Sequence, residues 1–154
     1  MVNVFECDFD NPTHTKALVL LMNHYMEDKM GDNPPLQGDD QRKLVDGLRN
    51  HPSKVVLLAT YDDKFVGLIN SFVNFGTFAV KPFINIHDVV VHTSCRGKGV
   101  GKALMNEIIA KAKSLDCGKI TLEVREDNIV AQNLYKSVGF GEGNPVMHFW
   151  SKYF

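Results

Sequence analysis

Three glycines and three cationic residues fall within the seven residues from Arg96 to Lys102, in the segment RGKGVGK. Glycine leaves backbone N–H groups uncovered because it has no Cβ. The segment runs directly into helix-like periodicity, and the first N–H groups of a helix are unpaired and lie at the positive end of its dipole. This combination predicts an anion site suited to a pyrophosphate. The alternative is a plain glycine-rich connection whose cations are solvated.

The spacing of the glycines separates this segment from two other phosphate-binding motifs. A Walker A loop requires G-x-x-x-x-G-K-[ST]. Aligning its G-K pair with Gly101 and Lys102 puts Arg96 in place of the first glycine and Ala103 in place of the Ser or Thr. A dinucleotide fingerprint requires G-x-G-x-x-G after the first strand, whereas this chain has G-x-G-x-G after several strands. The pattern that fits is R-x-x-G-x-G.

The elements that must position this turn follow from the periodicity of apolar residues. The segment FINIHDVVVH predicts a strand before the turn, and apolar residues every three to four positions predict a helix over 99–115. A later helix is predicted over 128–138, with Asn128 as its N-cap and Gly139 as its terminating glycine. The other predicted elements are a strand at 2–9, helices at 13–30 and 41–48, two strands within 54–75 joined at Asp62-Asp63, and strands at 119–124 and 147–154. The order β-α-α-β-β-β-α-β-α-β predicts a mixed α/β sheet with helices on its faces.

Length and composition limit the class of protein. The 154 residues suit one domain with a substantial core, and 44% hydrophobic with 23% charged residues is typical of a soluble globular chain. A net charge of −1 gives no global field that would attract nucleic acid or an anionic membrane. The chain shows no secretory signal pattern and no apolar run long enough for a membrane span. We therefore expect neither nucleic-acid nor membrane partners.

The cysteines and histidines predict neither disulfides nor a metal site. Cys7, Cys95 and Cys117 are odd in number and widely spaced, without a C-x-x-C pair. The six histidines fall in no metal-binding spacing. Free thiols fit a reducing compartment, so the expected location is the cytoplasm.

Two separate motifs resemble those of one enzyme family. The R-x-x-G-x-G pattern, formed by Arg96, Gly99 and Gly101, is similar to the acetyl-coenzyme A pyrophosphate loop of the GNAT N-acetyltransferase superfamily. Further along, NIVAQNLYKSVGF resembles the family's N-x-x-A-x-x-L-Y-x-x-x-G-F. The resemblance is tight over 86–140 and rests on element order alone in the N-terminal half. One departure is Thr93, where the family often has proline.

The resemblance implies a single N-acetyltransferase-like domain over 1–154. Residues 86–140 would form its acetyl-CoA-binding core, and residues 13–53 would form the helices and loop that shape the acceptor pocket. The implied fold is α/β, with a mixed central sheet of about six to seven strands flanked by about four helices. A V-shaped splay would separate the fourth and fifth strands. No metal is implied.

The activity implied by the resemblance is transfer of an acetyl group from acetyl-CoA to an amine, by direct attack in a ternary complex. The developing oxyanion needs aligned donors, and the leaving thiolate needs a proton. The family uses the tyrosine at the position of Tyr135 as general acid, and the alternative is a core-packed tyrosine. Asn128 would cap its helix and bond the pantetheine arm. The implied cofactor-binding residues are Val89, Val90 and Val91 through their main chain, Arg96, Gly97, Lys98, Gly99, Val100, Gly101, Lys102, Asn128 and Tyr135.

The general base is the least defined part of the implied site. In the family's diamine acetyltransferases a Glu-Asp pair occupies the place of His87-Asp88, so an imidazole replaces the first carboxylate. Imidazole changes charge near neutral pH, which makes His87 a candidate base, with a half-buried structural histidine as the alternative. Neighbouring strand residues point to opposite faces, so only one of His87 and Asp88 is expected to face the acceptor. Glu123 is a further candidate, with a surface pair to Arg125 as its alternative, and a water chain to any of these would also serve.

The predicted acceptor region is rich in acids. Its charged residues are Glu27, Asp28, Asp32, Asp39 and Asp40 against Lys29. Such a rim favours a cationic amine, and a solvated surface loop is the alternative. The phenylalanines that either line the same mouth or pack in the core are Phe72, Phe75, Phe78 and Phe83.

We expect the acceptor to be a small amine, polyamine-like or amino-acid-like. A protein lysine or N-terminus as acceptor, and a non-catalytic acetyl-CoA-binding or regulatory module, are the alternatives. An edge strand within 147–154 would be able to pair with a second subunit, which makes a homodimer possible.

Overall fold

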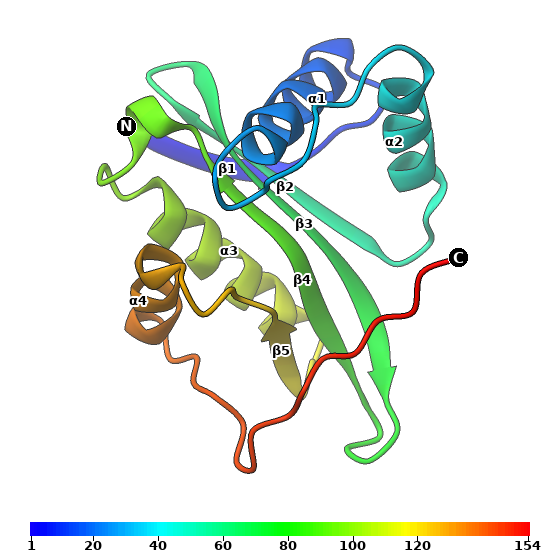
Figure 1. Ribbon diagram of the computed structural model, residues 1–154, viewed down its shortest axis with the longest axis vertical. Coiled ribbons are helices and arrows are strands. Elements are labelled where there is room, and N and C mark those ends of the chain that lie inside the picture. The colour runs from blue at the N-terminus through cyan, green and yellow to red at the C-terminus, as the bar shows by residue number, and fades with distance from the viewer.

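The computed structural model describes all of residues 1–154 and shows an α/β fold built on one mixed sheet (Figure 1). The strands are β1 (Val2–Glu6), β2 (Lys54–Tyr61), β3 (Lys64–Gly76), β4 (Lys81–Val91) and β5 (Lys119–Leu122). The helices are α1 (Pro12–Met26), α2 (Asp39–Asn50), α3 (Val100–Ser114) and α4 (Ile129–Ser137), with a short 3-10 turn, Thr93–Cys95, before α3. The predicted element order is confirmed through α4, as is the number of helices.

The sheet runs in chain order, β1-β2-β3-β4-β5, with all neighbours antiparallel except the parallel pair β4 and β5. The β2–β3 connection turns at Asp62 and Asp63, which both have left-handed φ angles of 49° and 61°. Two successive left-handed residues match the twist of a hairpin. The predicted hairpin is therefore confirmed.

Helices cover both faces of the sheet and form two separate cores (Figure 1). On one face α1 and α2 pack on the sheet around Leu18, Leu21 and Leu68. On the other face α3 and α4 enclose a larger core that includes Leu104 and Ile108. The sheet is thus buried on both sides, which explains why β2 and β3 are nearly continuous apolar runs. No helix combines the length and apolarity needed to cross a membrane.

The first helix is shorter than predicted. It begins as expected, with the Asn11 side chain accepting a hydrogen bond from the Thr13 N–H and Pro12 in the first turn. It ends at Met26 rather than at Met30. The Asp28 carboxylate accepts a hydrogen bond from the Met30 N–H at 2.9 Å, and this local bond offers the backbone a turn in place of another helical turn.

The prediction of six to seven strands is wrong, because the sheet has five. The predicted last strand, 147–154, belongs to a segment over 141–154 that has neither helix nor strand. Alternating apolar residues make a strand only when a neighbouring strand accepts their backbone hydrogen bonds, and this segment makes no backbone hydrogen bond with the rest of the chain.

Candidate active site

The turn before α3 holds its glycines for two different reasons. Gly97 and Gly99 have positive φ angles of 76° and 83°, where other residues are strained. A Cβ built on either one would meet no atom within 4 Å, so the space outside this turn is open. A Cβ on Gly101 would lie 3.0 Å from Leu134 Cδ2, so this third glycine allows α4 to pack closely on α3.

The backbone N–H groups of this turn are mostly without a partner. Five of them donate to no acceptor in the protein, and they belong to Gly97, Gly99, Val100, Gly101 and Lys102. The exception is the Lys98 N–H, which reaches the Cys95 carbonyl at a long 3.4 Å. Gly99 is the N-cap of α3 and supplies no side-chain cap. A set of free donors at the positive end of a helix is an anion site.

Strand β4 has an open edge beside this turn. Its pairing with β5 ends at Ile86 opposite Leu122, and β4 continues to Val91 without a neighbour on that side. The His92 N–H donates to Val66 of β3, so alternation directs the main-chain groups of Val90 to β3 as well. The main chains of Val89 and Val91 then face the open edge. Of the three residues predicted to bind the cofactor through their main chain, only these two have main-chain groups on this side. The V-shaped splay itself stays a prediction.

All three predicted cations are exposed, and two of them, Arg96 and Lys98, already have contacts within the protein. The Arg96 guanidinium donates to Asp28 at 2.8 Å and to the Val91 carbonyl at 3.4 Å. The Met30 N–H and then Arg96 lower the pKa of Asp28. Lys98 lies over the Tyr61 ring, 5.2 Å from its centre. Arg96 therefore links the turn to the loop that follows α1.

Two histidines form a second link between α1 and the turn. The rings of His24 and His92 stack with centroids 4.2 Å apart, and His24 Nε2 accepts a hydrogen bond from the Thr93 N–H. The His24 ring stands near the Arg96 and Asp28 pair. Burial, His92 and Arg96 lower the pKa of His24, which favours the neutral acceptor form that this hydrogen bond requires.

Tyr135 lies on the inner side of α4 and is buried in the larger core, with Phe140 as its aromatic neighbour. Burial, and then Tyr25, raise the pKa of Tyr135 to about 12. Its hydroxyl makes no hydrogen bond within the protein, yet it is absent from the polar atoms sealed inside the molecule without a partner. A ligand in the adjoining space is therefore able to accept its proton.

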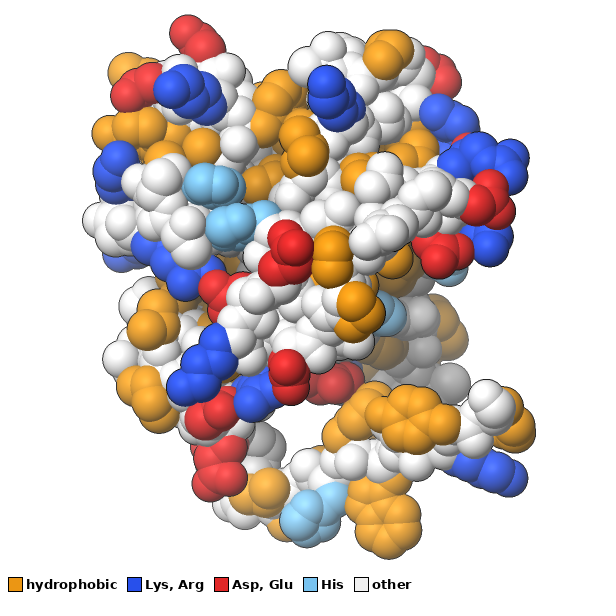
Figure 2. All heavy atoms as spheres, turned by 45° about the horizontal axis from the view of Figure 1, so that its top comes forward, with side chains coloured by type: hydrophobic (Ala, Val, Ile, Leu, Met, Phe, Trp, Pro, Cys, Tyr) orange, Lys and Arg blue, Asp and Glu red, His pale blue; other side chains and the backbone are white.

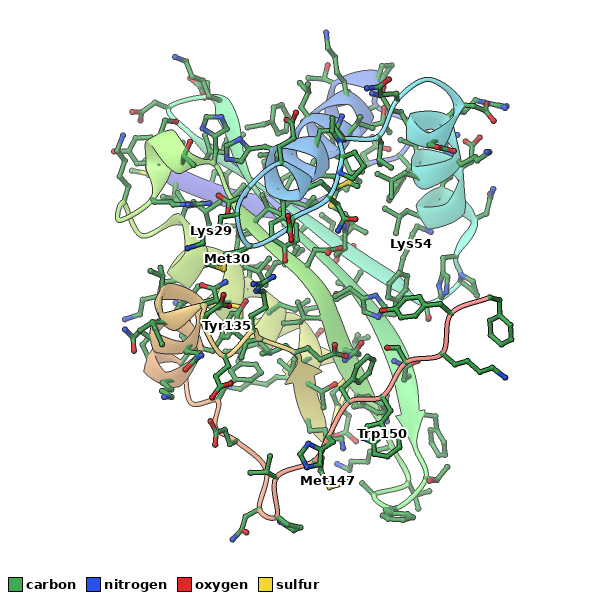
Figure 3. All side chains as sticks on the ribbon, viewed as in Figure 1. Lys29, Met30, Lys54, Tyr135, Met147 and Trp150 are labelled. Atoms are coloured by element: carbon green, nitrogen blue, oxygen red, sulfur yellow. The ribbon has the colours of Figure 1, made fainter.

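Tyr25 approaches the same space from the other face of the sheet. It lies near the end of α1, and burial, Asp88 and Asp28 raise its pKa. Tyr25 and Tyr135 belong to the cores on opposite faces of the sheet, and Tyr25 contributes to the raised pKa of Tyr135. In Figure 3 Tyr135 is seen below Lys29 and Met30 of the loop after α1.

The expectation that His87 and Asp88 point to opposite faces of the sheet is wrong. Asn70 pairs with Asp88 and the next residue of β3, Ser71, pairs with Ile86, so His87 is the extra residue of a β-bulge. His87 packs edge-on against Phe72, which belongs to the core under α1. Asp88 bonds Asn70, which also contacts Met22 of α1. The bulge thus breaks the alternation and turns both candidates to the α1 face.

The half-buried Asp88 and the buried Asn70 form a polar pair at this face. Asn70 Nδ2 donates to Asp88 Oδ2 at 3.0 Å, while Asn70 Oδ1 is buried without any hydrogen-bond partner. Burial raises the pKa of Asp88, and the Asn70 hydrogen bond and then His87 offset part of that rise. His87 is exposed, so Asp88 is the more protected of the two candidates. A half-buried carboxylate with a raised pKa is typical of a functional site.

The remaining candidate groups are Glu123 and Asn128, and only the role expected of Asn128 as an N-cap is seen in the structure. Glu123 and Arg125 do not pair, because Arg125 binds Asp127 at 2.9 Å and Glu123 is exposed. Asn128 caps α4 by accepting from the Ala131 N–H at 3.1 Å, which confirms the N-cap and leaves its amide N–H groups for a ligand. No cluster of three or more His, Cys, Asp or Glu side chains is arranged to hold a metal ion.

The acidic rim is largely neutralised within the chain. The ion pairs are Asp28 with Arg96, Asp39 with Arg42 and Asp40 with Lys43, and these leave Glu27 and Asp32 unpaired. The four phenylalanines are not gathered at one mouth. Phe72 lies between His51 and His87, whereas Phe75 and Phe78 are exposed near the β3–β4 turn.

Comparison with known proteins decides the family. The model of the acetyltransferase (GNAT) family matches residues 18–140. The chain belongs to the GNAT acetyltransferase family. A solved structure, that of an aminoglycoside acetyltransferase from an uncultured soil metagenomic sample, superposes with a TM-score of 0.80 at 20% identity over 99% of this chain and 96% of that one. At this identity the likeness shows the fold.

Two curated relatives match a shorter part of this GNAT protein. One segment of 55 residues, 36% of this chain, is 40% identical to the N-alpha-acetyltransferase RimI of Mycobacterium tuberculosis and spans 33% of that protein. A match of the same length is 47% identical to the uncharacterized protein ML0378 of Mycobacterium leprae and spans 14% of that protein. The chain thus matches a third or less of the length of these two relatives.

Sequence reasoning missed several residues of this site. Tyr25 and His24 read as ordinary helix residues, and nothing in the pattern of α1 separates them from their neighbours. Asn70 had a signal, because it is a polar side chain within the buried run of β3. The link from Asp28 to Arg96 joins residues 68 positions apart, and no local pattern reveals it.

Proposed function

We propose that this chain is an acetyl-CoA-dependent N-acetyltransferase that acetylates the amine of a small molecule by direct attack in a ternary complex. The observation that carries the proposal is the run of free N–H groups from Gly97 to Lys102 at the start of α3. A pyrophosphate offers the oxygen acceptors that these donors lack. The open space outside Gly97 and Gly99 gives it room to approach.

The pantetheine arm would lie along the open edge of β4. Main-chain groups of Val89 and Val91 face this edge and would pair with the arm as they would with a strand. Asn128 would bond it from the start of α4 with the amide N–H groups that capping leaves free. The thioester would then lie in the space that Tyr25 and Tyr135 approach from opposite faces.

Tyr135 would assist departure of the CoA thiolate. A phenol with a pKa of about 12 stays protonated at neutral pH and can donate to sulfur. A thiol has a pKa of about 8.5 in water, so complete transfer from this phenol to a solvated thiolate is uphill by roughly three to four pKa units. Tyr135 therefore acts chiefly by a hydrogen bond that strengthens as negative charge develops on sulfur.

Asp88 would accept the proton that the attacking amine loses, directly or through one water. Amines arrive protonated, because their pKa is about 10.4 in water, and a nearby carboxylate both attracts the ammonium and takes part in its deprotonation. Asp88 lies one residue before the Val89 backbone, on the face that α1 covers. Asn70 positions the carboxylate by donating to it at 3.0 Å.

The kind of amine accepted would be set by the Asp88 carboxylate rather than by the acidic loop after α1. With Asp28, Asp39 and Asp40 already paired, the loop attracts cations weakly. The half-buried Asp88 would select a compact ammonium that fits between α1 and β4. A second candidate acceptor, a protein N-terminus, is favoured by the 55-residue match to the N-alpha-acetyltransferase RimI.

A panel assay tests the proposal. Thiol release from acetyl-CoA is measured with diamines, amino acids and short peptides, and we expect turnover with at least one small amine. Tyr135→Phe should lower kcat about a hundredfold with an unchanged Kd for CoA. Tyr153→Phe, at an exposed tyrosine on residues 141–154, is the matched control and should leave both unchanged. CoA binding without turnover across the panel would instead support a non-catalytic acetyl-CoA-binding module.

A further inference from the structure

A groove of about 950 Å³, which we call the α1 groove, runs along α1 from Thr13 to Glu27. It is lined by one face of α1, by residues 35–37 of the loop before α2, by residues 63–65 of the β2–β3 hairpin and by His92. Neither Asp88 nor Tyr135 lines it, so it is separate from the candidate active site. Figure 2 shows this face hollowed, with hydrophobic side chains in the hollow and histidines at its edge. A hollow of this size suits a small ligand.

The two ends of the α1 groove carry unpaired charges of opposite sign. Lys16 and Lys64 lie at one end, because the Phe65 ring packs beside the first turn of α1. Both ammonium groups are exposed and belong to no ion pair, and Asp63 can offset only one of the two charges. Glu27 stands at the other end and is an exposed carboxylate without an ion-pair partner. The charges therefore complement an elongated zwitterion.

The spacing of these charges sets the length of the ligand. Glu27 follows Lys16 by about three helical turns, which places both on the same face of α1 and about 16 Å apart along its axis. An extended peptide advances about 3.3 Å per residue, so about five residues span this distance. Between the two charges Leu20 is 60% exposed, and Leu36 and Phe65 are half-buried beside it. Apolar side chains in the middle of a peptide would cover this surface.

The α1 groove also offers hydrogen bonds to a peptide backbone. The Thr13 hydroxyl and the Gln37 side-chain amide line the groove and bond to no other group of the protein. Asn23, by contrast, donates to the Leu36 carbonyl at 3.2 Å and accepts from the Leu36 N–H at 2.8 Å. These two bonds hold the loop against α1, so this wall of the groove is formed before any ligand binds, which lowers the cost of binding.

We propose that the α1 groove binds a short peptide with free ends and that this peptide regulates the binding of CoA. The peptide carboxylate lies at Lys16 and Lys64, and its ammonium lies at Glu27. Its apolar side chains cover Leu20. The peptide site does not depend on the proposed acetyltransferase activity, whereas the regulatory role rests on the proposed binding of CoA at the turn.

Two histidines connect the α1 groove to the turn. His24 lines the groove, and its Nε2 accepts a hydrogen bond from the Thr93 N–H at 3.2 Å. His92 also lines the groove, and its ring stacks on that of His24 with centroids 4.2 Å apart. A peptide packed on these rings restrains the segment that leads into the turn. Peptide and CoA should therefore each bind more tightly in the presence of the other, and by the same factor.

The first test is titration with a peptide of the expected length and charge. Isothermal titration of the full chain with Gly-Leu-Ala-Leu-Gly, without any acetyl donor, should show saturable binding at one site. Amidation of the C-terminus and acetylation of the N-terminus should each raise the Kd about two- to fivefold, the scale of an exposed charge pair. No binding, or equal binding of all three forms, overturns the proposal.

The second test assigns each end of the peptide to its side chain. The double variant Lys16→Gln with Lys64→Gln should raise the Kd of the free peptide about fivefold and leave that of the amidated peptide unchanged. Glu27→Gln should act in the same way on the free and N-acetylated forms. The control is Lys113→Gln, an exposed lysine on α3, which should change neither Kd. Equal weakening of the free and amidated peptides in the double variant overturns the proposed orientation.

The third test measures the coupling to the turn. The Kd of Gly-Leu-Ala-Leu-Gly should fall about fivefold in saturating CoA, and the Kd for CoA should fall by the same factor in saturating peptide. His24→Ala removes the acceptor for the Thr93 N–H and should abolish this coupling. A peptide Kd that is unchanged or raised by CoA overturns the regulatory role. Because no acetyl donor takes part, this outcome is distinct from a failure of turnover in the amine panel.

Discussion

The turn over residues 96–102 and the α1 face around Asp88 both offer polar groups to a ligand, but they are assembled in opposite ways. The turn offers main-chain N–H groups from consecutive residues, held by two left-handed glycines. The Asp88 face offers side chains, and these come from α1, β3 and β4. The turn is open to solvent, whereas Asn70 is 3% exposed.

Because of this difference, we expect the two regions to respond differently to substitutions. Side-chain changes at the turn leave its N–H groups in place, so only changes in backbone conformation should abolish its function. At the Asp88 face one carboxylate carries the charge, so one substitution removes the chemistry. The turn should therefore tolerate most substitutions, and the Asp88 face very few.

The largest expected effect is that of Asp88→Asn on activity. If Asp88 is the base, kcat/KM falls by about a hundredfold or more, the usual scale for losing a general base. In the wild type the acid limb of kcat/KM should titrate above 3.8, because burial raises the pKa of Asp88 from that ordinary value. His87→Gln is the matched control at the neighbouring position. A larger loss for His87→Gln than for Asp88→Asn would assign the base to the imidazole.

The same substitution should stabilise the protein at neutral pH. A raised pKa in the folded state means that the Asp88 contribution to stability is present below its unfolded pKa and is lost as pH rises through the folded value. At neutral pH the charged carboxylate of Asp88 therefore lowers the stability of the folded state, and replacing it by a neutral amide removes this destabilisation. The new amide can also donate to the unpaired Asn70 Oδ1. The Tm of Asp88→Asn should exceed that of the wild type at pH 7, with a smaller difference near pH 3.

A substitution that strains the backbone of the turn tests whether its conformation is needed to bind CoA. Gly99→Val places a β-branched residue at a φ of 83°, a strain of about 1–3 kcal/mol, and should raise the Kd for CoA roughly tenfold to a hundredfold. The matched control is Gly38→Val, because Gly38 also has a positive φ, open space around it and an N-cap position, but on α2. Isothermal titration of both variants with CoA checks this. Equal weakening in both would show that strain acts on the whole fold.

The two regions also differ in how far the sequence predicts them. The turn and the capping of α4 by Asn128 were predictable because their residues are contiguous or a few positions apart. The bulge at His87 was not, because it arises from a register shift between β3 and β4 that alternation along one strand cannot reveal. The last strand was predicted wrongly because composition gives strand propensity but not a partner.

The link between the two regions gives a smaller prediction. Asp28 holds Arg96 at 2.8 Å and places a negative charge near the predicted pyrophosphate. Asp28→Asn should free Arg96 and lower the Kd for CoA by about two- to fivefold, while Arg96→Ala should raise it. Asp39→Asn, which breaks an exposed pair with Arg42, is the control and should change nothing. Weaker CoA binding in Asp28→Asn would mean that Asp28 positions Arg96 rather than competing for it.

The smallest expected effect is a pH dependence of the second link. The pKa of His24 is lowered by burial, then by His92 and Arg96, while Asp28 and Glu27 act against this. A lowered pKa means that the stability His24 contributes is present above its ordinary value of 6.5 and is lost as pH falls through the folded value. Protonation also ends the acceptance of the Thr93 N–H and sets a charge 4.2 Å from the ring of His92.

His24→Gln keeps a hydrogen-bond acceptor but cannot be protonated between pH 7.5 and pH 5. The comparison therefore isolates the effect of the positive charge on His24. Between pH 7.5 and pH 5 the wild type should lose more Tm than His24→Gln does, by a few degrees at most. His51→Gln, at an exposed histidine after α2, should follow the wild type. The Kd for CoA should rise over the same pH interval in the wild type and in His51→Gln but not in His24→Gln, because the stacked pair holds α1 to the turn. If both proteins lose Tm in parallel, the histidines do not join the two regions, and Arg96 with Asp28 is their main connection.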